Sequence, residues 1–143
     1  MSLIRQLAEY ERAPGQVRGT EALLSDGLFG PHANAEAVLA ELEGEPIGFA
    51  LFFHTFSTWE ARRGLWLEDL FVLPEHRRGG VGRRLLAHLA RIALERGYAR
   101  FEWTALDWNT PALDFYAALG AQVMVQWRTL RLEGDALRRL GSS

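Results

Sequence analysis

The chain has 143 residues, of which 48% are hydrophobic and 24% are charged, so one folded domain over residues 1–143 is expected and wholesale disorder is excluded. Cysteine is absent and all 16 basic residues are arginine, which excludes disulfides, a thiol nucleophile, a Schiff-base lysine and the lysine of a P-loop. The net charge of −2 makes nucleic acid and anionic membranes poor partners. Because the chain shows neither a membrane-length apolar run nor a signal peptide, a cytoplasmic location is expected.

The first half of the chain is predicted to form two helices followed by a β-hairpin. Apolar residues recur at helical spacing over residues 3–12 and a Pro-Gly pair then ends the pattern, while Thr20 is predicted to cap a second helix. Residues 33–43 and 47–58 are predicted strands joined by a tight turn at Gly44-Glu45. The second of these strands carries large apolar side chains on both faces, so we expect it to be central in the sheet.

The second half alternates strands and helices, which favours parallel pairing in that part of the sheet. The predicted elements are a strand over 65–73, a helix over 83–96 stopped by Gly97, a strand over 99–106, a helix from Asn109 to Gly120, a strand over 122–132 and a helical turn over 135–140. A hairpin followed by parallel pairing predicts the α/β class (α+β), with a mixed sheet flanked by helices on both faces.

A Gly-rich turn between the predicted strand 65–73 and the following helix is the most informative segment. It reads Arg77-Arg78-Gly79-Gly80-Val81-Gly82 and continues into Arg83. Free amides at a helix start, glycines before it and nearby guanidinium groups together predict an anion site, usually for phosphate. A Walker loop is excluded because there is no lysine, and a dinucleotide fingerprint is not met. The remaining readings are a plain Gly-rich connection with surface arginines and the turn of an acetyltransferase family.

The turn resembles the Arg/Gln-x-x-Gly-x-Gly/Ala motif of GCN5-related N-acetyltransferases (GNAT), with Arg77, Gly80 and Gly82 at the motif positions. Asn109, Ala112 and Phe115-Tyr116 resemble the Asn-x-x-Ala-x-x-Phe-Tyr stretch of the same family. The diamine (spermidine/spermine and thialysine) acetyltransferase branch has similar stretches over nearly the whole chain, which here read Leu7-Ala8-Glu9-Tyr10-Glu11, Gln16-Val17, Leu67-Glu68-Asp69-Leu70-Phe71-Val72, Asp107-Trp108-Asn109 and Trp127-Arg128.

The resemblance implies acetyl-CoA as co-substrate, no metal, and roles for individual residues. Glu68 and Tyr116 match the catalytic residues, and Glu11, Glu68 and Trp59 are assigned to the amine pocket. The residues assigned to the coenzyme are Leu70, Phe71, Val72, Arg77, Arg78, Gly79, Gly80, Val81, Gly82, Arg83, Asn109 and Tyr116.

Four carboxylates are candidates for attracting an ammonium group and accepting its proton: Glu9, Glu11, Glu68 and Asp69. Since neighbouring residues of a strand point to opposite faces, only one of Glu68 and Asp69 is expected to line the amine site, and the resemblance favours Glu68. A backbone amide near Leu70 is expected to stabilise the oxyanion. The Tyr116 phenol is expected to protonate the leaving thiolate.

Two departures from the family pattern bear on the expectations. The family's first strand, which precedes its first helix, is missing here, so a sheet edge is either open or covered by a partner chain. The loop Thr55-Phe56-Ser57-Thr58-Trp59 lacks the acidic residue usual in polyamine enzymes, which favours shorter amines or a lysine-like amino acid.

The expected function is therefore N-acetyl transfer from acetyl-CoA to the primary amine of a small cationic substrate, directly in a ternary complex. The candidate substrates are a diamine, a polyamine or a lysine-like amino acid. The alternatives are a non-catalytic acyl-CoA-binding or regulatory module on the same fold, and a protein N-terminal or lysine acetyltransferase. A homodimer is expected from the aromatic-rich strands and the open edge.

Overall fold

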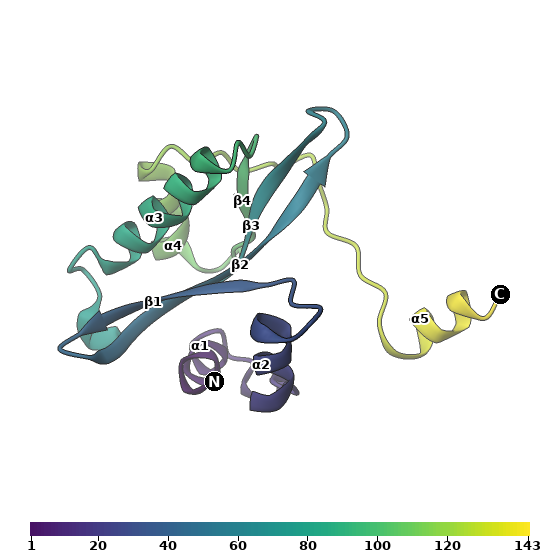
Figure 1. Cartoon of the computed structure of the whole chain (residues 1–143), viewed down its shortest axis with the longest axis horizontal. Coiled ribbons are helices and arrows are strands. Elements are labelled where there is room, and N and C mark those ends of the chain that lie inside the picture. The colour runs from purple at the N-terminus through teal and green to yellow at the C-terminus, as the bar shows by residue number, and fades with distance from the viewer. The chain divides into compact units, whose positions relative to one another are not determined.

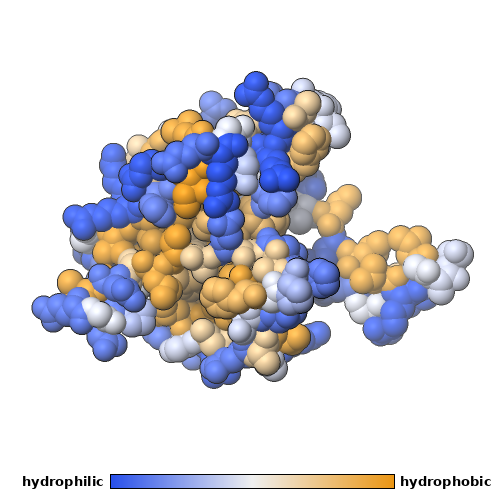
Figure 2. All heavy atoms as spheres, viewed as in Figure 1, coloured by the Kyte–Doolittle hydropathy of each residue, from blue (hydrophilic) through white to orange (hydrophobic).

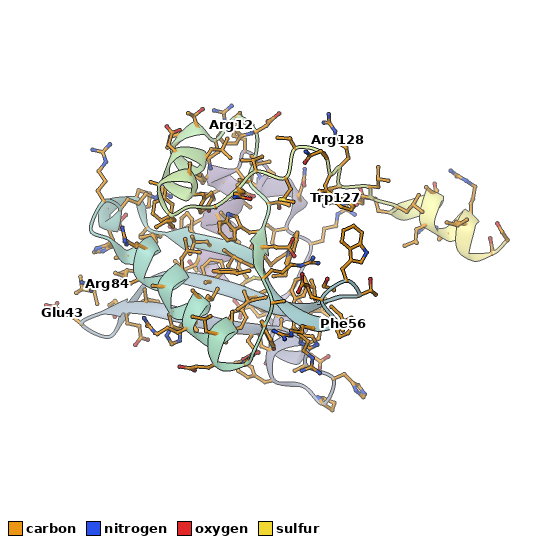
Figure 3. All side chains as sticks on the ribbon, turned by 90° about the horizontal axis from the view of Figure 1, so that it is seen from above. Arg12, Glu43, Phe56, Arg84, Trp127 and Arg128 are labelled. Atoms are coloured by element: carbon orange, nitrogen blue, oxygen red, sulfur yellow. The ribbon has the colours of Figure 1, made fainter.

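The sheet begins with the predicted hairpin. In the computed structural model, which describes residues 1–143, β1 (Glu36–Leu42) pairs antiparallel with β2 (Glu45–Ser57). The turn is Glu43-Gly44, one residue earlier than predicted, and Figure 3 shows Glu43 at its tip. Both turn residues have positive φ, 52° and 85°, the backbone that matches the right-handed twist of paired strands.

β3 (Arg62–Val72) and β4 (Phe101–Trp103) complete a sheet with the order β1-β2-β3-β4, shown in Figure 1. β2 and β3 are antiparallel, whereas β3 and β4 are parallel, so the prediction of a mixed sheet with an inner second strand is confirmed. β4 covers three residues of the predicted strand 99–106 because its ladder pairs only with residues 65–67 of β3. No strand precedes the first helix in residues 1–143.

The chain divides into two compact units, residues 1–104 and 105–143. In the first, α1 (Ser2–Tyr10) places Leu7 against Phe49 and Phe71 on one face of the sheet. α3 (Val81–Glu95) covers the opposite face, as Figure 1 shows, and buries its Leu85, Leu86, Leu89 and Ala93. Helices on both faces of a mixed sheet confirm the predicted α/β class.

Helix ends in the first unit follow local rules that the sequence carries. The Thr20 hydroxyl accepts a hydrogen bond from the Leu23 amide at 3.2 Å, which confirms the predicted cap of α2 (Glu21–Phe29). Gly97 has φ 68°, and the Tyr98 amide donates back to the Ala93 carbonyl at 2.8 Å, a hydrogen-bond pattern that ends α3 at the predicted place. Short 3-10 turns, η1 (Pro14–Gln16) and η2 (Pro74–His76), complete this unit.

The second unit contains α4 (Thr110–Ala118) and α5 (Gly134–Gly141), joined by an extended segment. The strand predicted over 122–132 is wrong: its only backbone hydrogen bonds are local, from Val125 to Val123 and from Trp127 to Met124. Apolar residues favour a strand, but a strand also needs backbone hydrogen bonds to a neighbouring strand, which this segment lacks. Its apolar side chains are exposed, with Leu130 at 92%. None of the five helices is long and apolar enough to cross a membrane.

Candidate active site

A β-bulge at Glu68 shapes the centre of the candidate site. Leu51 of β2 pairs with Asp69, whereas the next residue, Phe52, pairs with Leu67, so Glu68 is the extra residue of β3. A bulge interrupts the alternation of side chains along a strand. The expectation that Glu68 and Asp69 point to opposite faces is therefore wrong. Asp69, which pairs with Leu51, lies on the α1 face of the sheet. The same face carries Trp66 and Phe71 of β3.

Three carboxylates gather on this face. Burial is the main cause that raises the pKa of Asp69 to about 6, and the negative charges of Glu68 and Glu11 raise it further. Burial also raises the pKa of Glu11, which follows the last residue of α1. The structure thus brings together both carboxylates predicted for the amine pocket and adds Asp69, which the alternation argument had set apart.

The sequence contains a signal for this bulge. The sheet face opposite α1 carries Leu65 and Leu67 before Glu68-Asp69 and, one residue out of phase, Leu70 and Val72 after it, where they pair with Ala50 and Gly48. Two consecutive polar residues inside an apolar strand are typical of such a shift.

Trp66 orients one of the three carboxylates. Its indole Nε1 donates a hydrogen bond of 3.1 Å to Oε2 of Glu68, and its ring lies 6.4 Å from that of Phe53 between centroids. Glu68 is exposed and Asp69 is partly buried, so the two neighbouring acids differ in solvation. This difference in solvation suits the exposed acid to holding a cation and the partly buried acid to accepting a proton.

Beyond the bulge, one edge of β3 has no strand beside it, because β4 pairs only with residues 65–67. The Leu73 amide donates to the Ile47 carbonyl at 2.9 Å, and hydrogen-bonded pairs alternate in an antiparallel ladder. The backbone groups of Leu70 and Val72 therefore face the open edge. This position is consistent with the predicted main-chain contacts to an acetyl thioester.

The Gly-rich turn follows this open edge directly. Arg78 and Gly80 have φ 67° and 79°, and Gly80 is the N-cap residue of α3. The first amide paired within the helix belongs to Arg84, which donates to the Gly80 carbonyl at 3.0 Å. The amides of residues 81–83 are thus left for an external acceptor at the positive end of the helix.

Arg77 is turned away from these amides. Its Nε donates to the Val72 carbonyl at 2.9 Å, and its guanidinium carbon lies 4.6 Å from the centre of the Tyr10 ring and 5.3 Å from that of Phe71. The other exposed arginines near the turn are Arg78, Arg83 and Arg84, and Figure 3 shows the last of these projecting from α3.

Tyr116 and Asn109 both belong to the second unit. Tyr116 is half-buried on α4, with its ring centroid 5.4 Å from that of Phe115. Asn109 occupies the N-cap position of α4, but its side chain makes no capping hydrogen bond. Pro111 within the first turn already fits a helix start, since it lacks the amide that a cap would satisfy.

Trp59 lies apart from the carboxylates. It occupies the connection between β2 and β3 and is 89% exposed. Glu68 lies six positions beyond Arg62, where β3 begins, which is about 20 Å at the rise of a strand. The structure therefore does not bring Trp59 together with the three acids.

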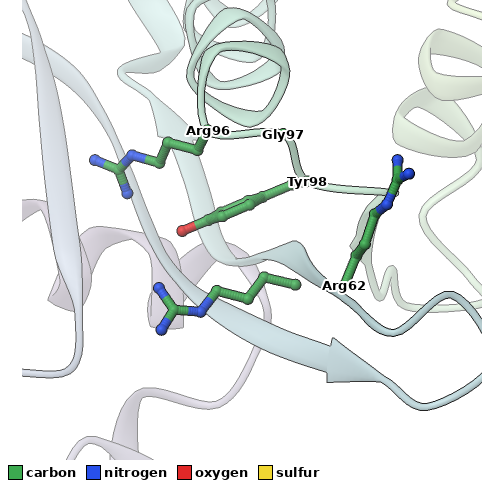
Figure 4. Close-up of a pocket in the computed structure, with 5 residues that line it drawn as sticks. Arg62, Arg96, Gly97 and Tyr98 are labelled. Atoms are coloured by element: carbon green, nitrogen blue, oxygen red, sulfur yellow. The ribbon is translucent and has the colours of Figure 1, made fainter.

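A separate hollow of about 380 Å³ is lined by Arg62, Arg63, Arg96, Gly97 and Tyr98, beyond the C-terminal end of α3 (Figure 4). Arg96 is held there by hydrogen bonds of 2.6 and 2.8 Å to Glu36, whose pKa this contact lowers. In Figure 4 the guanidinium groups of Arg62 and Arg96 lie on either side of the Tyr98 ring. These charges do not converge, and none of the predicted site residues lines this hollow.

Comparisons with known proteins identify a family and similar structures for this chain. Residues 3–121 match the acetyltransferase (GNAT) family. The thialysine N-epsilon-acetyltransferase of Bos taurus is 40% identical over 98% of this chain and 88% of its own length. The L-ornithine N5-acetyltransferase NATA1 of Arabidopsis thaliana is 43% identical over 65% of this chain and 41% of its own length. An integron cassette protein from the mobile metagenome of V. cholerae superposes with a TM-score of 0.83 at 29% identity, covering 99% of this chain and 89% of that one.

The family match covers the bulged strand, the Gly-rich turn and α4. The predicted resemblance is therefore confirmed. The chain belongs to the acetyltransferase (GNAT) family, in its diamine- and thialysine-acetyltransferase-like branch, and is an N-acetyltransferase enzyme.

Proposed function

We propose that this enzyme transfers the acetyl group of acetyl-CoA directly to the primary amine of a small cationic substrate, in a ternary complex and within one domain formed by residues 1–143. The observation that carries the proposal is the cluster of Glu11, Glu68 and Asp69 beside the open edge of β3. A site with three acids suits a substrate with a positive charge, and the open edge offers backbone groups for a thioester.

The cluster deals with the main obstacle to amine acetylation. A primary amine with a pKa near 10.4 is mostly protonated at pH 7, and removing its proton costs about 4 kcal/mol. Glu68 and Glu11 attract the ammonium group, and a carboxylate accepts its proton directly or through water. With a pKa of about 6, Asp69 is better matched to this proton than an ordinary aspartate, so we assign it as an acceptor alongside the predicted Glu68.

The open edge of β3 and the Gly-rich turn bind acetyl-CoA, the acetyl donor. The Leu70 amide is the donor that we assign to the developing oxyanion, and the backbone from Phe71 to Val72 follows the pantetheine arm. The amides from Gly79 to Arg83 bind the pyrophosphate, and the guanidinium groups of Arg78 and Arg83 add charge. Asn109 is assigned a coenzyme contact from its place in the family's motif.

The chemical step is a nucleophilic substitution at the acetyl carbonyl. The neutral amine nitrogen forms a bond to the carbonyl carbon, the C–S bond then breaks, and the amine's second proton leaves to a carboxylate or water. The thiolate takes a proton from the Tyr116 phenol, which is then reprotonated from solvent. Tyr116 receives this role because α4 carries the family's Phe-Tyr pair at residues 115–116.

The relatives narrow the class of substrate. Thialysine and L-ornithine, named for two curated relatives, are amino acids that carry a primary amine at the end of the side chain. The three acids suit such an amine, and the neutral loop over residues 55–59 suits a substrate shorter than spermine. We propose a diamine or a lysine-like amino acid as the acceptor.

We also propose that the enzyme acts as a homodimer. Apolar side chains are exposed along the extended segment 123–132 and on α5, where Figure 2 shows them in orange. Trp127, at 68% exposure, projects from this segment in Figure 3. Exposed apolar patches of this kind mark association surfaces. Light scattering coupled to gel filtration should give twice the chain mass, and a single chain mass at micromolar concentration contradicts this part of the proposal.

An amine panel tests the proposal. Purified enzyme is mixed with acetyl-CoA and, separately, thialysine, L-ornithine, lysine, putrescine, spermidine or an aminoglycoside, and thiol release is followed. We expect the highest kcat/KM with a diamine or lysine-like amino acid, and a lower value for spermidine. Donor binding by calorimetry without turnover of any amine indicates a non-catalytic acyl-CoA-binding module. Turnover only with peptides indicates a protein acetyltransferase.

A further inference from the structure

Arg77 bridges two parts of the proposed site that are distant in sequence. Its guanidinium carbon lies over the Tyr10 ring of α1 at 4.6 Å and over the Phe71 ring of β3 at 5.3 Å. Its Nε donates to the carbonyl of Val72 at 2.9 Å. One side chain from the Gly-rich turn thus contacts both the helix that leads to Glu11 and the strand that carries Asp69.

This arrangement is unlike that of an arginine whose only task is to attract a phosphate. Such a group gains most when its donors stay available to an anion in solvent, and Arg78 and Arg83 beside the turn are exposed. Arg77 is also exposed, but one of its donors is directed to a backbone carbonyl in a partly buried hydrogen bond. Its planar guanidinium stacks on aromatic faces, a contact that a glutamine side chain at the same place cannot reproduce.

α1 packs on the sheet through Leu7 and the partly buried Leu3 and Ile4. It has nine residues, a length at which an isolated helix is marginal in water, and Leu7 is its only buried residue. Leu7 packs against Phe49 and Phe71 near the middle of the helix, whereas Tyr10 lies at its last residue, next to Glu11. The contact with Arg77 therefore acts at the end of α1 from which Glu11 follows.

The contact between Arg77 and Tyr10 lies at the wall of a hollow. A hollow of about 230 Å³ is lined by Gln6, Glu9, Tyr10, Phe71, Pro74 and Arg77. It joins residues of α1, β3 and η2, so a change in the position of Arg77 alters the wall that α1 contributes.

We propose that Arg77 is a positioning residue for the amine pocket, because its bridge from Tyr10 to Val72 fixes Glu11 relative to Asp69. This inference rests on the proposed function for its kinetic meaning and assigns Arg77 a task beyond its expected contact with the coenzyme. It predicts that loss of the Arg77 guanidinium raises the KM for the acceptor amine more than the KM for acetyl-CoA.

The kinetic test compares Arg77→Gln with Arg78→Gln. Glutamine removes the charge but is compatible with the family's motif at position 77. Arg77→Gln should raise the KM for the best amine of the panel about 3- to 10-fold, the size expected for losing a stacked cation and its hydrogen bond. Its KM for acetyl-CoA should change less than 2-fold. Arg78→Gln should show the reverse pattern. An Arg77→Gln enzyme in which only the KM for acetyl-CoA rises overturns the proposal.

A second measurement needs no activity. Hydrogen exchange of the α1 amides should become faster in Arg77→Gln and in Tyr10→Leu, with α3 amides unchanged as the internal control. The double variant should exchange no faster than either single variant, since both remove one shared contact. Additive effects, or unchanged exchange in α1, contradict the bridge.

The two measurements also separate this inference from the proposed function. Faster α1 exchange in an enzyme that acetylates no amine leaves the bridge standing and removes the proposed function. Amine acetylation with α1 exchange and amine KM unaffected by Arg77→Gln leaves the function standing and removes the bridge.

Discussion

Trp66 and Glu68 lie two residues apart on β3 and are joined by a hydrogen bond of 3.1 Å from the indole Nε1 to Oε2 of the carboxylate. Because Glu68 is the extra residue of a bulge, its side chain is otherwise free to rotate into solvent. The indole thus fixes one oxygen and leaves the other for the ammonium group of the substrate.

Trp66→Phe keeps an aromatic ring against Phe53 and removes the hydrogen-bond donor. We expect kcat/KM for the amine to fall about 3- to 10-fold, the size of one ordinary hydrogen bond at an exposed carboxylate, with stability changed by less than about 1 kcal/mol. Steady-state kinetics and urea unfolding measure the two quantities. Trp127→Phe is the matched control on an exposed tryptophan. Equal kcat/KM for Trp66→Phe and the parent enzyme removes Trp66 from the site.

Asp69→Asn should make the protein more stable at neutral pH while lowering its activity. The folded-state pKa of Asp69, about 6, lies above its ordinary value of 3.8, so the folded chain holds this proton more tightly than the unfolded chain. The favourable contribution of Asp69 is fully present below pH 3.8 and is lost as the pH rises through 6. Asparagine avoids that loss, so we expect a gain of about 1 to 2 kcal/mol at pH 7.5 and a smaller gain at pH 5, measured by urea unfolding. A loss of stability at pH 7.5 contradicts the account.

The pH profile of kcat/KM for the amine should rise with a midpoint near 6 on its acidic side, because Asp69 accepts a proton only when ionised. Glu68→Gln removes one of the negative charges that raise the pKa of Asp69, so the acidic limb should move to lower pH. Both profiles are recorded with saturating acetyl-CoA. An acidic limb that stays in place in Glu68→Gln, or one that persists in Asp69→Asn, assigns the titrating group elsewhere.

Tyr116→Phe should lower kcat on the order of 100-fold, the usual contribution of a general acid, without weakening donor binding. Its ring contact with Phe115 needs no hydroxyl, so the variant should fold as the parent does. Single-turnover acetylation measures the rate, and calorimetric titration with coenzyme A measures binding. A parent-like rate would falsify the role of the phenol, and weaker binding with an unchanged rate makes Tyr116 a binding residue.

Periodicity and capping rules predicted most of the fold because they act locally. Thr20, Gly97 and the apolar stripe of α3 each specify a helix through their neighbours in sequence. Residues 122–132 were predicted as a strand because their apolar pattern is equally local, whereas a strand depends on a ladder that the pattern does not contain.

Only part of the candidate site was predicted, because sequence patterns describe local structure and the site also depends on strand pairing and tertiary packing. Motifs predicted the Gly-rich turn and Glu68 as site residues, and their roles in the reaction stay predictions. Asp69 was set aside because strict alternation was applied across Glu68-Asp69, and one extra residue in a ladder reverses that argument. The contact of Arg77 with Tyr10 spans 67 positions of sequence and depends on tertiary packing, which no local pattern encodes.

The central claim is direct acetyl transfer to a small amine, and an isotope experiment tests it most directly. The enzyme is incubated with acetyl-CoA labelled in the acetyl group, first alone and then with thialysine or L-ornithine, and protein and amine are analysed separately by mass spectrometry. We expect the label on the amine nitrogen and none bound covalently to the protein. Label retained on the protein with donor alone, or an amine that stays unlabelled while the donor binds, contradicts the account.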